Sequence, residues 1–148
     1  MRKILSPPIL VVISIGLMGL LNYFIRKPVF AREPWTVAAA IPAVLGIVIA
    51  YSAWRRMRRE GTTVKCFNEP ARLVTSGVFR YTRNPIYVGY VLGLIGAWIA
   101  YGAVSAGLVV VVFVLVVDRF YIRWEEKTLA RKFGQDYEAY RAQTRRWI

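Results

Sequence analysis

Long apolar runs separated by short polar segments dominate the chain. Four of these runs approach the roughly 20 residues that a helix needs to cross a bilayer. They are predicted to be transmembrane helices, at residues 8–25, 35–54, 85–101 and 104–120. Pro7 and Pro8 open the first run and Pro85 opens the third, which suits the preference of proline for a first helical turn. The pattern therefore predicts an all-α, polytopic membrane protein with about four transmembrane helices.

A second pattern follows the fourth run, within residues 121–142. Leu129, Phe133, Tyr137 and Tyr140 recur there at spacings of three and four residues. This period predicts an amphipathic helix with one apolar face, interrupted near Gly134. We expect this helix to leave the membrane on the cytoplasmic side. Residues 1–148 are then predicted to form a single membrane domain.

The charges predict the orientation in the membrane. Most of the 21 lysine and arginine residues lie in two segments, 55–83 and 119–146. Both segments are expected to face the cytoplasm, because positively charged loops stay on that side. Cys66 is then expected at the cytoplasmic face. Gly102 lies in the short uncharged turn between the third and fourth runs and is expected at the opposite face.

Composition narrows the possible chemistry. The 148 residues are 57% hydrophobic, carry a net charge of +13, and include no histidine and one cysteine. Histidine-dependent nucleophilic catalysis is excluded, and an ordinary zinc site lacks its ligands, so no metal is predicted. The positive charge follows from the orientation rule for membrane proteins, so nucleic acid is not expected as a partner. Carboxylates, tyrosines, arginines and backbone groups remain for any chemistry.

The junction between the polar loop and the third run is the first candidate site. Pro85 falls in the first helical turn and Asn84 at or near the N-cap, where its side chain is expected to accept a free backbone N–H. Free N–H groups at a helix start, with Arg83 beside them, favour an anionic group. The same residues equally suit a plain membrane-interface anchor, since arginine and tyrosine favour lipid headgroups.

Two further features leave alternatives open. Gly89, Gly93 and Gly96 form one bare face of the third run, which suits either close helix packing, the favoured interpretation, or a ligand groove. Asp118 lies at the end of the fourth run, beside Arg119. It is either an interfacial ion-pair partner, again the favoured interpretation, or a functional carboxylate at membrane depth.

Two blocks of the sequence resemble a known family. The first is Gly77-x-Phe79-x-x-x-Arg83-Asn84-Pro85-x-Tyr87-x-Gly89. It resembles the Gly-x-Tyr…Arg-His-Pro-x-Tyr-x-Gly signature of the isoprenylcysteine carboxyl methyltransferases, part of which the phospholipid methyltransferases share. The second is Glu125-Glu126 followed by Phe133-Gly134-x-x-Tyr137-x-x-Tyr140, which resembles the C-terminal pattern of that family. Asn84 stands where the family has the more familiar histidine.

The resemblance implies an integral-membrane methyltransferase that uses S-adenosylmethionine, with cofactor-site segments at 71–90 and 121–142. Positions that match the cofactor site of the family are Ala71, Arg72, Leu73, Val74, Phe79, Asn84, Pro85, Ile86, Tyr87 and the cofactor-binding Glu125. We add Arg83 as a cation beside the helix start. The substrate-side arginine of the family corresponds to Tyr121, so Arg123 or Arg119 is expected to replace it.

The order of the runs predicts where these segments meet. The third and fourth runs form a helical hairpin, so the helix start at Arg83 and the pair Glu125 and Glu126 are expected at the same membrane face. A pocket between them would combine cations and free N–H groups with carboxylates and tyrosines, which complement S-adenosylmethionine. No glycine-rich loop follows a strand, which excludes a soluble Rossmann-type methyltransferase.

The expected acceptor is a lipid-like or prenylated small molecule that enters from the bilayer. Carboxyl O-methylation is favoured, because an ionised carboxylate needs no base. Amine N-methylation remains an alternative, with Glu125 or Glu126 as the base and Arg123 on the substrate side. A function of another class also fits the sequence, namely a non-catalytic membrane scaffold or a small transporter subunit.

Overall fold

The computed structural model describes residues 5–25, 35–62 and 69–148; Cys66 lies outside these ranges. Within them the chain forms helices and no strands. The elements are α1 (Pro7–Phe24), the 3-10 helix η1 (Trp35–Ala39), α2 (Ala40–Arg59), the 3-10 helix η2 (Gly77–Arg80), α3 (Pro85–Tyr101), α4 (Val104–Val116), the π-helical segment η3 (Val117–Ile122), α5 (Arg123–Phe133) and α6 (Gln135–Gln143).

Three of the described helices are long and apolar enough to cross a membrane: Pro7–Phe24, Thr36–Arg59 and Val104–Phe133. The fourth apolar helix, α3, has 17 residues, at the lower end of the lengths that span a bilayer. These helices confirm the predicted all-α, polytopic membrane class.

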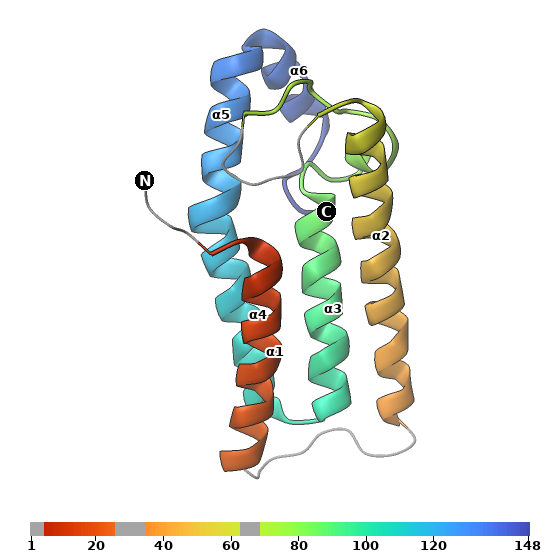
Figure 1. Cartoon of the computed structure of the whole chain (residues 1–148), viewed down its shortest axis with the longest axis vertical. Helices are drawn as coiled ribbons and strands as arrows, with labels where there is room; N and C mark the ends of the chain where they lie inside the picture. The colour runs from red at the N-terminus through yellow and green to blue at the C-terminus, as the bar shows by residue number, and fades with distance from the viewer. Residues whose placement is uncertain (1–4, 26–34, 63–68) are drawn as a thin grey trace.

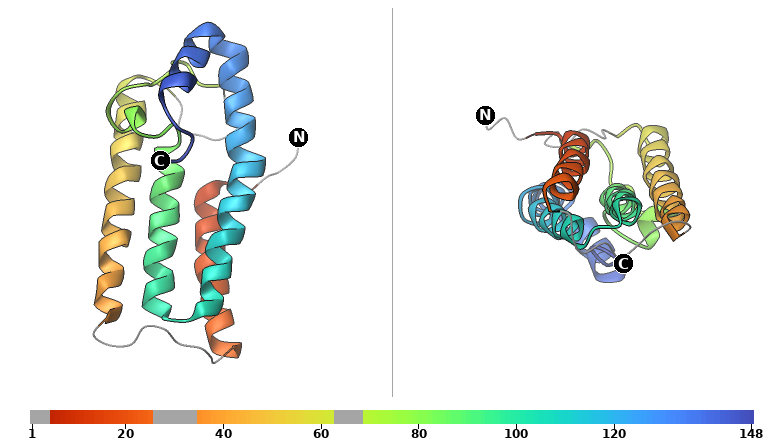
Figure 2. Two further views of the ribbon diagram at one scale, coloured as in Figure 1. Left: turned by 180° about the vertical axis from the view of Figure 1, so that it is seen from behind. Right: turned by 90° about the horizontal axis from the view of Figure 1, so that it is seen from below.

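Helix α3 occupies the centre of the bundle. Figure 1 shows α2 on one side of it and α1 with α4 on the other, and the view from below in Figure 2 shows the same order. Residues of α1, α3, α4 and η3 share one apolar core, which includes Met18, Leu94, Phe113 and Val117. Polar loops and the ends of α5 and α6 gather at one end of the bundle, which is therefore the place where a polar site can form.

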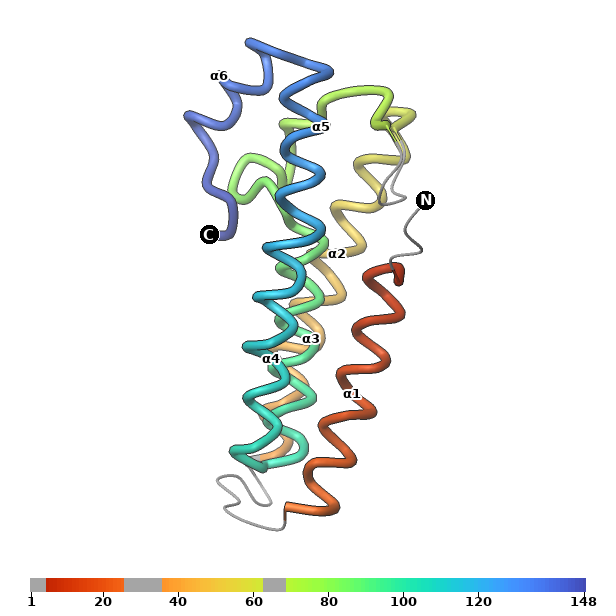
Figure 3. Tube along the Cα trace, turned by 90° about the vertical axis from the view of Figure 1, so that its left-hand side faces the viewer, coloured from red at the N-terminus to blue at the C-terminus, as the bar shows by residue number. Residues whose placement is uncertain are grey.

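One continuous helix runs from Val104 to Phe133. The sequence predicts a span ending at residue 120 and a separate amphipathic helix after it, whereas η3 joins α4 to α5 without a break (Figure 3). At this junction the N–H of Arg123 bonds to the carbonyl of Asp118, five residues earlier, which widens the turn. The predicted interruption at Gly134 is confirmed, because its φ of 50° ends α5.

Glycine permits close contact between α2 and α3. A Cβ added to Gly89 would lie 2.5 Å from the carbonyl oxygen of Gly46, and one added to Gly96 would lie 2.9 Å from that of Ala39. A Cβ added to Gly93 would have no atom within 4 Å. Close packing, the favoured interpretation of the stripe, therefore holds for Gly89 and Gly96, whereas Gly93 faces open space.

We expect Gly89→Ala to destabilise the protein by about 1–3 kcal/mol, because the methyl group must push two helix backbones apart. Gly93→Ala is the matched control and should change stability little, since its methyl group meets no atom. Thermal unfolding in one detergent compares the two variants. Equal melting temperatures would mean that α2 and α3 tolerate separation at this contact.

The predicted orientation of the chain in the membrane is best tested at exposed residues within the ranges that the structure describes. Gly102 is buried with φ of 63°, so a cysteine there would be strained. Thr75 and Val104 are exposed and lie toward opposite ends of α3. In a Cys66→Ser background, a membrane-impermeant thiol reagent should label Thr75→Cys only from the cytoplasmic side and Val104→Cys only from the other. Labelling of both from one side would contradict the predicted topology.

Candidate functional site

A cavity of about 590 Å³ lies at the polar end of the bundle. The start of α3 and the first turns of α5 form two of its walls, and the end of α2, α6, the loop before η2 and the start of α1 contribute the rest. Lining residues therefore come from segments far apart in the sequence. The cavity has the size of an ordinary small-molecule site.

Most of the residues predicted from the sequence meet at this cavity. Those that line it are Arg72, Leu73, Val74, Phe79, Arg83, Asn84, Pro85, Ile86, Tyr87, Glu125 and Glu126. Ala71 does not line it; its N–H donates a hydrogen bond to Thr62 Oγ1 at 3.0 Å, and Thr62 itself lines the cavity.

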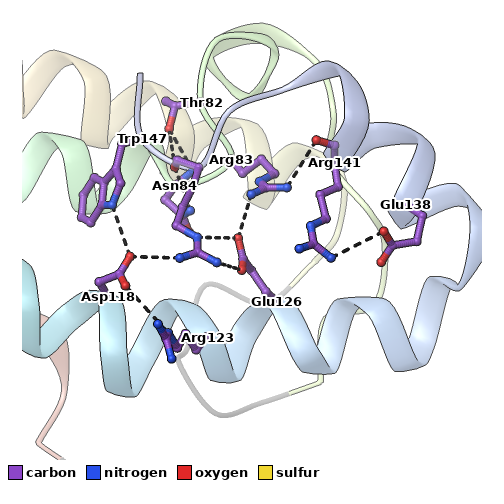
Figure 4. Close-up of polar contacts among 10 residues, drawn as sticks. Thr82, Arg83, Asn84, Asp118, Arg123, Glu126, Glu138, Arg141 and Trp147 are labelled. Carbon is purple, nitrogen blue, oxygen red and sulfur yellow. Dashed lines mark hydrogen bonds and ion pairs between the residues drawn. The ribbon is translucent and has the colours of Figure 1, made fainter.

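Neither of the two arginines expected to replace the substrate-side arginine of the family lines the cavity. Arg123 lies outside it, with Nε 3.9 Å from Asp118 Oδ2 and a half-exposed side chain (Figure 4). Arg119 is exposed and does not line the cavity. Tyr121, at the corresponding position, donates its hydroxyl hydrogen to the carbonyl oxygen of Leu5 at 2.6 Å. No cation that lines this cavity comes from η3 or α5.

About half of the lining residues were not named individually from the sequence, although Tyr90, Trp124, Thr128, Leu129, Tyr137 and Tyr140 lie within the predicted segments 71–90 and 121–142. The additional residues are Ser6, Pro7, Pro8, Trp54, Met57, Thr62, Pro70, Tyr90, Trp124, Thr128, Leu129, Tyr137 and Tyr140. Tyr137 and Tyr140 belong to the second sequence block, so that block did contain a signal for them. The start of α1 had none, because no local pattern predicts that residues 6–8 line the same cavity as α5.

The contact between the two halves of the site is direct. The Tyr87 hydroxyl donates a hydrogen bond to Glu125 Oε1 at 2.8 Å. Tyr87 is buried in the first turns of α3, and Glu125 lies in the first turn of α5. The predicted meeting of the helix start near Arg83 with the glutamate pair is thus confirmed.

Asn84 has a different role from the predicted one. It is the N-cap of α3 and Pro85 follows at N1, as expected, but its side chain accepts no helix N–H. Instead its Nδ2 donates to the carbonyl oxygen of Arg146 at 2.9 Å. The prediction of a capping side chain is wrong: the amide nitrogen donates to a carbonyl of a distant segment, and the amide oxygen receives no helix N–H.

Glu126 binds two arginines. Its Oε1 lies 3.0 Å from Arg83 Nη2, and its Oε2 lies 2.6 Å from Arg146 Nη2. Arg146 also lies 3.3 Å from Asp118 Oδ1, the atom that accepts from Trp147 Nε1 at 3.3 Å. Figure 4 shows Asp118, Glu126 and Arg83 in this network. Of the two interpretations of Asp118, the ion-pair partner is therefore the one that the structure supports.

Two tyrosines of α6 close the cavity. The Tyr140 hydroxyl donates to the carbonyl oxygen of Phe79 at 2.7 Å. The Tyr137 hydroxyl is buried and has no hydrogen-bond partner among the described residues. Burial, and secondarily the charge of Glu126, raise the pKa of Tyr137 to about 12. Tyr137 thus keeps its proton at neutral pH, with its hydroxyl oxygen enclosed by protein atoms.

Arg83 adds a second unused donor. Its Nη groups contact Glu126 and the carbonyl of Arg141, whereas its buried Nε has no partner among the described residues. Buried donors normally have partners. Both donors belong to residues that line the cavity, although the two atoms themselves are covered by protein atoms.

Comparison with known proteins relates this site to a family. The sequence profile of the phospholipid methyltransferase family matches residues 35–136. A protein-S-isoprenylcysteine O-methyltransferase of Schizosaccharomyces pombe is 36% identical over 77 residues, which is 50% of this chain and 31% of the relative. A probable protein-S-isoprenylcysteine O-methyltransferase of Oryza sativa subsp. indica is 31% identical over 116 residues, 74% of this chain and 59% of the relative.

A shorter relative is matched over its whole length. It is an uncharacterized protein of Haemophilus influenzae, 36% identical over 63 residues, which is 43% of this chain. No solved structure matches the chain. The family profile covers both walls of the cavity, from α2 to the start of α6. The chain belongs to the phospholipid methyltransferase family.

Proposed function

We propose that the chain is an integral-membrane methyltransferase that binds S-adenosylmethionine in the cavity at the polar end of the bundle. The observation that carries the proposal is the Tyr87–Glu125 contact, which joins the family's two sequence blocks in the wall of one cavity. Family membership supports methyl transfer, and the long apolar helices support a membrane setting.

The lining fits the groups of S-adenosylmethionine. Arg72 forms no ion pair with a described residue and offers its guanidinium to the ligand carboxylate. Glu125 can accept from the ligand ammonium or ribose hydroxyls. When bound, this cofactor supplies a methyl group activated by its sulfonium.

The residues that line the cavity chiefly bind and orient the cofactor and the acceptor. Methyl transfer is an in-line displacement, so positioning of donor and acceptor provides much of the rate. Apolar residues of the lining, among them Leu73, Val74 and Phe79, exclude water from the reacting groups. Proton removal has little support here, since Glu126 already binds two arginines and Glu125 accepts from Tyr87. The lining therefore favours an acceptor that needs no base, such as a carboxylate.

A second hollow supports a lipid-like acceptor. An apolar groove of about 440 Å³ lies between α1, α2 and α3. It passes the open face of Gly93 and shares Trp54, Ile86 and Tyr90 with the cavity. An acyl or prenyl tail in this groove would place a polar head near Tyr87. The acceptor that we propose is accordingly a lipid or a prenylated small molecule whose carboxyl group becomes methylated.

Calorimetric titration with S-adenosylhomocysteine in detergent tests this function. Micromolar binding, together with transfer of label from radioactive S-adenosylmethionine into the lipid-soluble fraction of a membrane extract, is the expected result. Absence of binding at millimolar ligand would overturn the proposal. It would leave the non-catalytic scaffold or transporter subunit as the better description.

A further inference from the structure

Residues 145–147 connect the two walls of the cavity. The carbonyl oxygen of Arg145 accepts from the N–H of Arg83 at 2.9 Å. The carbonyl oxygen of Arg146 accepts from Thr82 Oγ1 at 3.1 Å and from Asn84 Nδ2 at 2.9 Å. Three consecutive residues before α3 are thus held by this short segment, although about 60 positions separate them in the sequence.

The side chain of Arg146 reaches the opposite wall. Its Nε and Nη2 lie 3.1 and 2.6 Å from the two oxygens of Glu126, and its Nη1 lies 3.3 Å from Asp118 Oδ1. A planar guanidinium can make such a two-pronged contact, whereas an ammonium cannot. One residue therefore binds the loop before α3 through its backbone and the η3–α5 helix through its side chain.

The charges explain why this contact matters. Asp118 and Glu126 are mostly buried, with side-chain exposures of 19% and 13%. Without Arg146, each carboxylate would keep one described cation within 4 Å. Glu126 would keep Arg83, and Asp118 would keep the half-exposed Arg123, whose Nε lies 3.9 Å away. A poorly paired carboxylate at this depth favours a rearrangement that admits water or a new partner. The same interactions raise the pKa of Arg146, foremost its hydrogen bond to Glu126.

Glu125 is the neighbour of Glu126 on the same helical turn. The contact of Arg146 with Glu126 therefore also limits the rotation and the axial shift of that turn. It thereby fixes the position of the Glu125 carboxylate opposite Tyr87. The loop that Arg146 holds also carries Arg83, whose Nε has no described partner. One residue that does not line the cavity therefore contacts both cavity walls, the loop before α3 through its backbone and the η3–α5 helix through its side chain.

We propose that Arg146 is a positioning residue: by binding Glu126, Asp118 and the 82–84 loop together, it holds Glu125 and Tyr87 at the spacing that the nucleoside ligand requires. This inference rests on the proposed function. It assigns Glu126 to the support of the site in place of proton transfer.

Arg146→Ala and Arg146→Lys test the inference, with Arg131→Ala as the matched control. Arg131 is exposed and pairs with the exposed Glu69 at 3.1 Å, away from the network. Arg146→Ala should raise the Kd for S-adenosylhomocysteine about tenfold or more, the scale of coupling within one ion-pair network. Arg146→Lys should restore part of the affinity, and Arg131→Ala should bind like the wild type.

A second measurement separates positioning from general damage. With N-acetyl-S-farnesylcysteine as the acceptor, Arg146→Ala should raise the KM for S-adenosylmethionine and leave the KM for the acceptor unchanged. In a Glu126→Gln background, Arg146→Ala should weaken ligand binding by less than about threefold, because the contact through which it acts is already weakened. If Arg146→Ala fails to fold, Arg146→Lys in the two backgrounds provides the same comparison.

The outcomes distinguish this inference from the function on which it rests. Three outcomes would overturn the positioning role without contradicting the proposed methyltransferase function. They are wild-type affinity in both Arg146 variants, equal rises in the two KM values, and independent, multiplicative effects of the Arg146 and Glu126 substitutions on Kd. A wild-type protein that binds no S-adenosylhomocysteine overturns the proposed function, and the positioning role with it.

Discussion

Replacement of Glu125 by glutamine is expected to weaken S-adenosylhomocysteine binding by roughly 1–3 kcal/mol, the scale for loss of a charge-assisted or buried polar contact. The side chain keeps its shape but loses the charge that can hold a ligand ammonium or ribose hydroxyl. Tyr87→Phe should also weaken binding, because Glu125 Oε1 loses the donor that lies 2.8 Å away. Titration calorimetry measures both effects.

The control for this pair is Arg131→Ala. An arginine at the end of α2 is less suitable, since Arg58 lies 5.3 Å from the ring centre of Trp54, which lines the cavity. Combining Glu125→Gln with Tyr87→Phe should cost less than the sum of the single changes, because the two side chains act through one contact. Full additivity, or an equal loss in Arg131→Ala, would contradict the assignment of these residues to the ligand site.

Lengthening the tail of an acceptor should lower its apparent KM steeply. Each buried methylene contributes about 0.8 kcal/mol, and the apolar groove beside the cavity offers room for a tail. A series of S-alkyl or S-prenyl N-acetylcysteines with one head group and increasingly long tails tests this by initial rates. The trend should end when the tail outgrows the groove.

Filling the groove should remove that dependence. Gly93→Leu adds a side chain where the wild type has open space, whereas Gly93→Ala adds only a methyl group and serves as the control. We expect the leucine variant to raise the KM of long-tailed acceptors and to leave S-adenosylhomocysteine binding unchanged. A tail-less acceptor turned over as efficiently as its lipid analogue would contradict tail binding in the groove.

Much of the fold follows from local pattern. Apolar runs predict the helices because backbone groups in a bilayer must be satisfied within the helix. The uncharged turn at Gly102 predicts the α3–α4 hairpin, which brings Tyr87 and Glu125 to one end. The sequence does not predict features that depend on contacts between distant segments or on whether two neighbouring helices join into one. Nothing in the 104–133 stretch interrupts a helix before Gly134, so one helix forms in place of two.

The supporting parts of the site had no signal of their own. Arg146 and Trp147 belong to no periodic pattern and to no motif. Their contacts with Glu126 and Asp118 depend on the direction in which the chain leaves α6, which no local pattern predicts. Asn84 was placed at the correct N-cap, but its amide partner comes from 62 positions away. The substrate-side role of Arg119 or Arg123 stays a prediction, since neither residue lines the cavity.

The continuous helix from Val104 to Phe133 couples the site to the lipid around it. At 1.5 Å per residue its 30 residues extend about 45 Å, well beyond a hydrocarbon layer of roughly 30 Å. A thinner or thicker bilayer changes the tilt of such a helix. Glu125 and Glu126 lie on its protruding end, so a change in tilt moves one wall of the cavity against the start of α3. If the chain is the methyltransferase that we propose, its turnover should accordingly vary with the acyl-chain length of the host membrane.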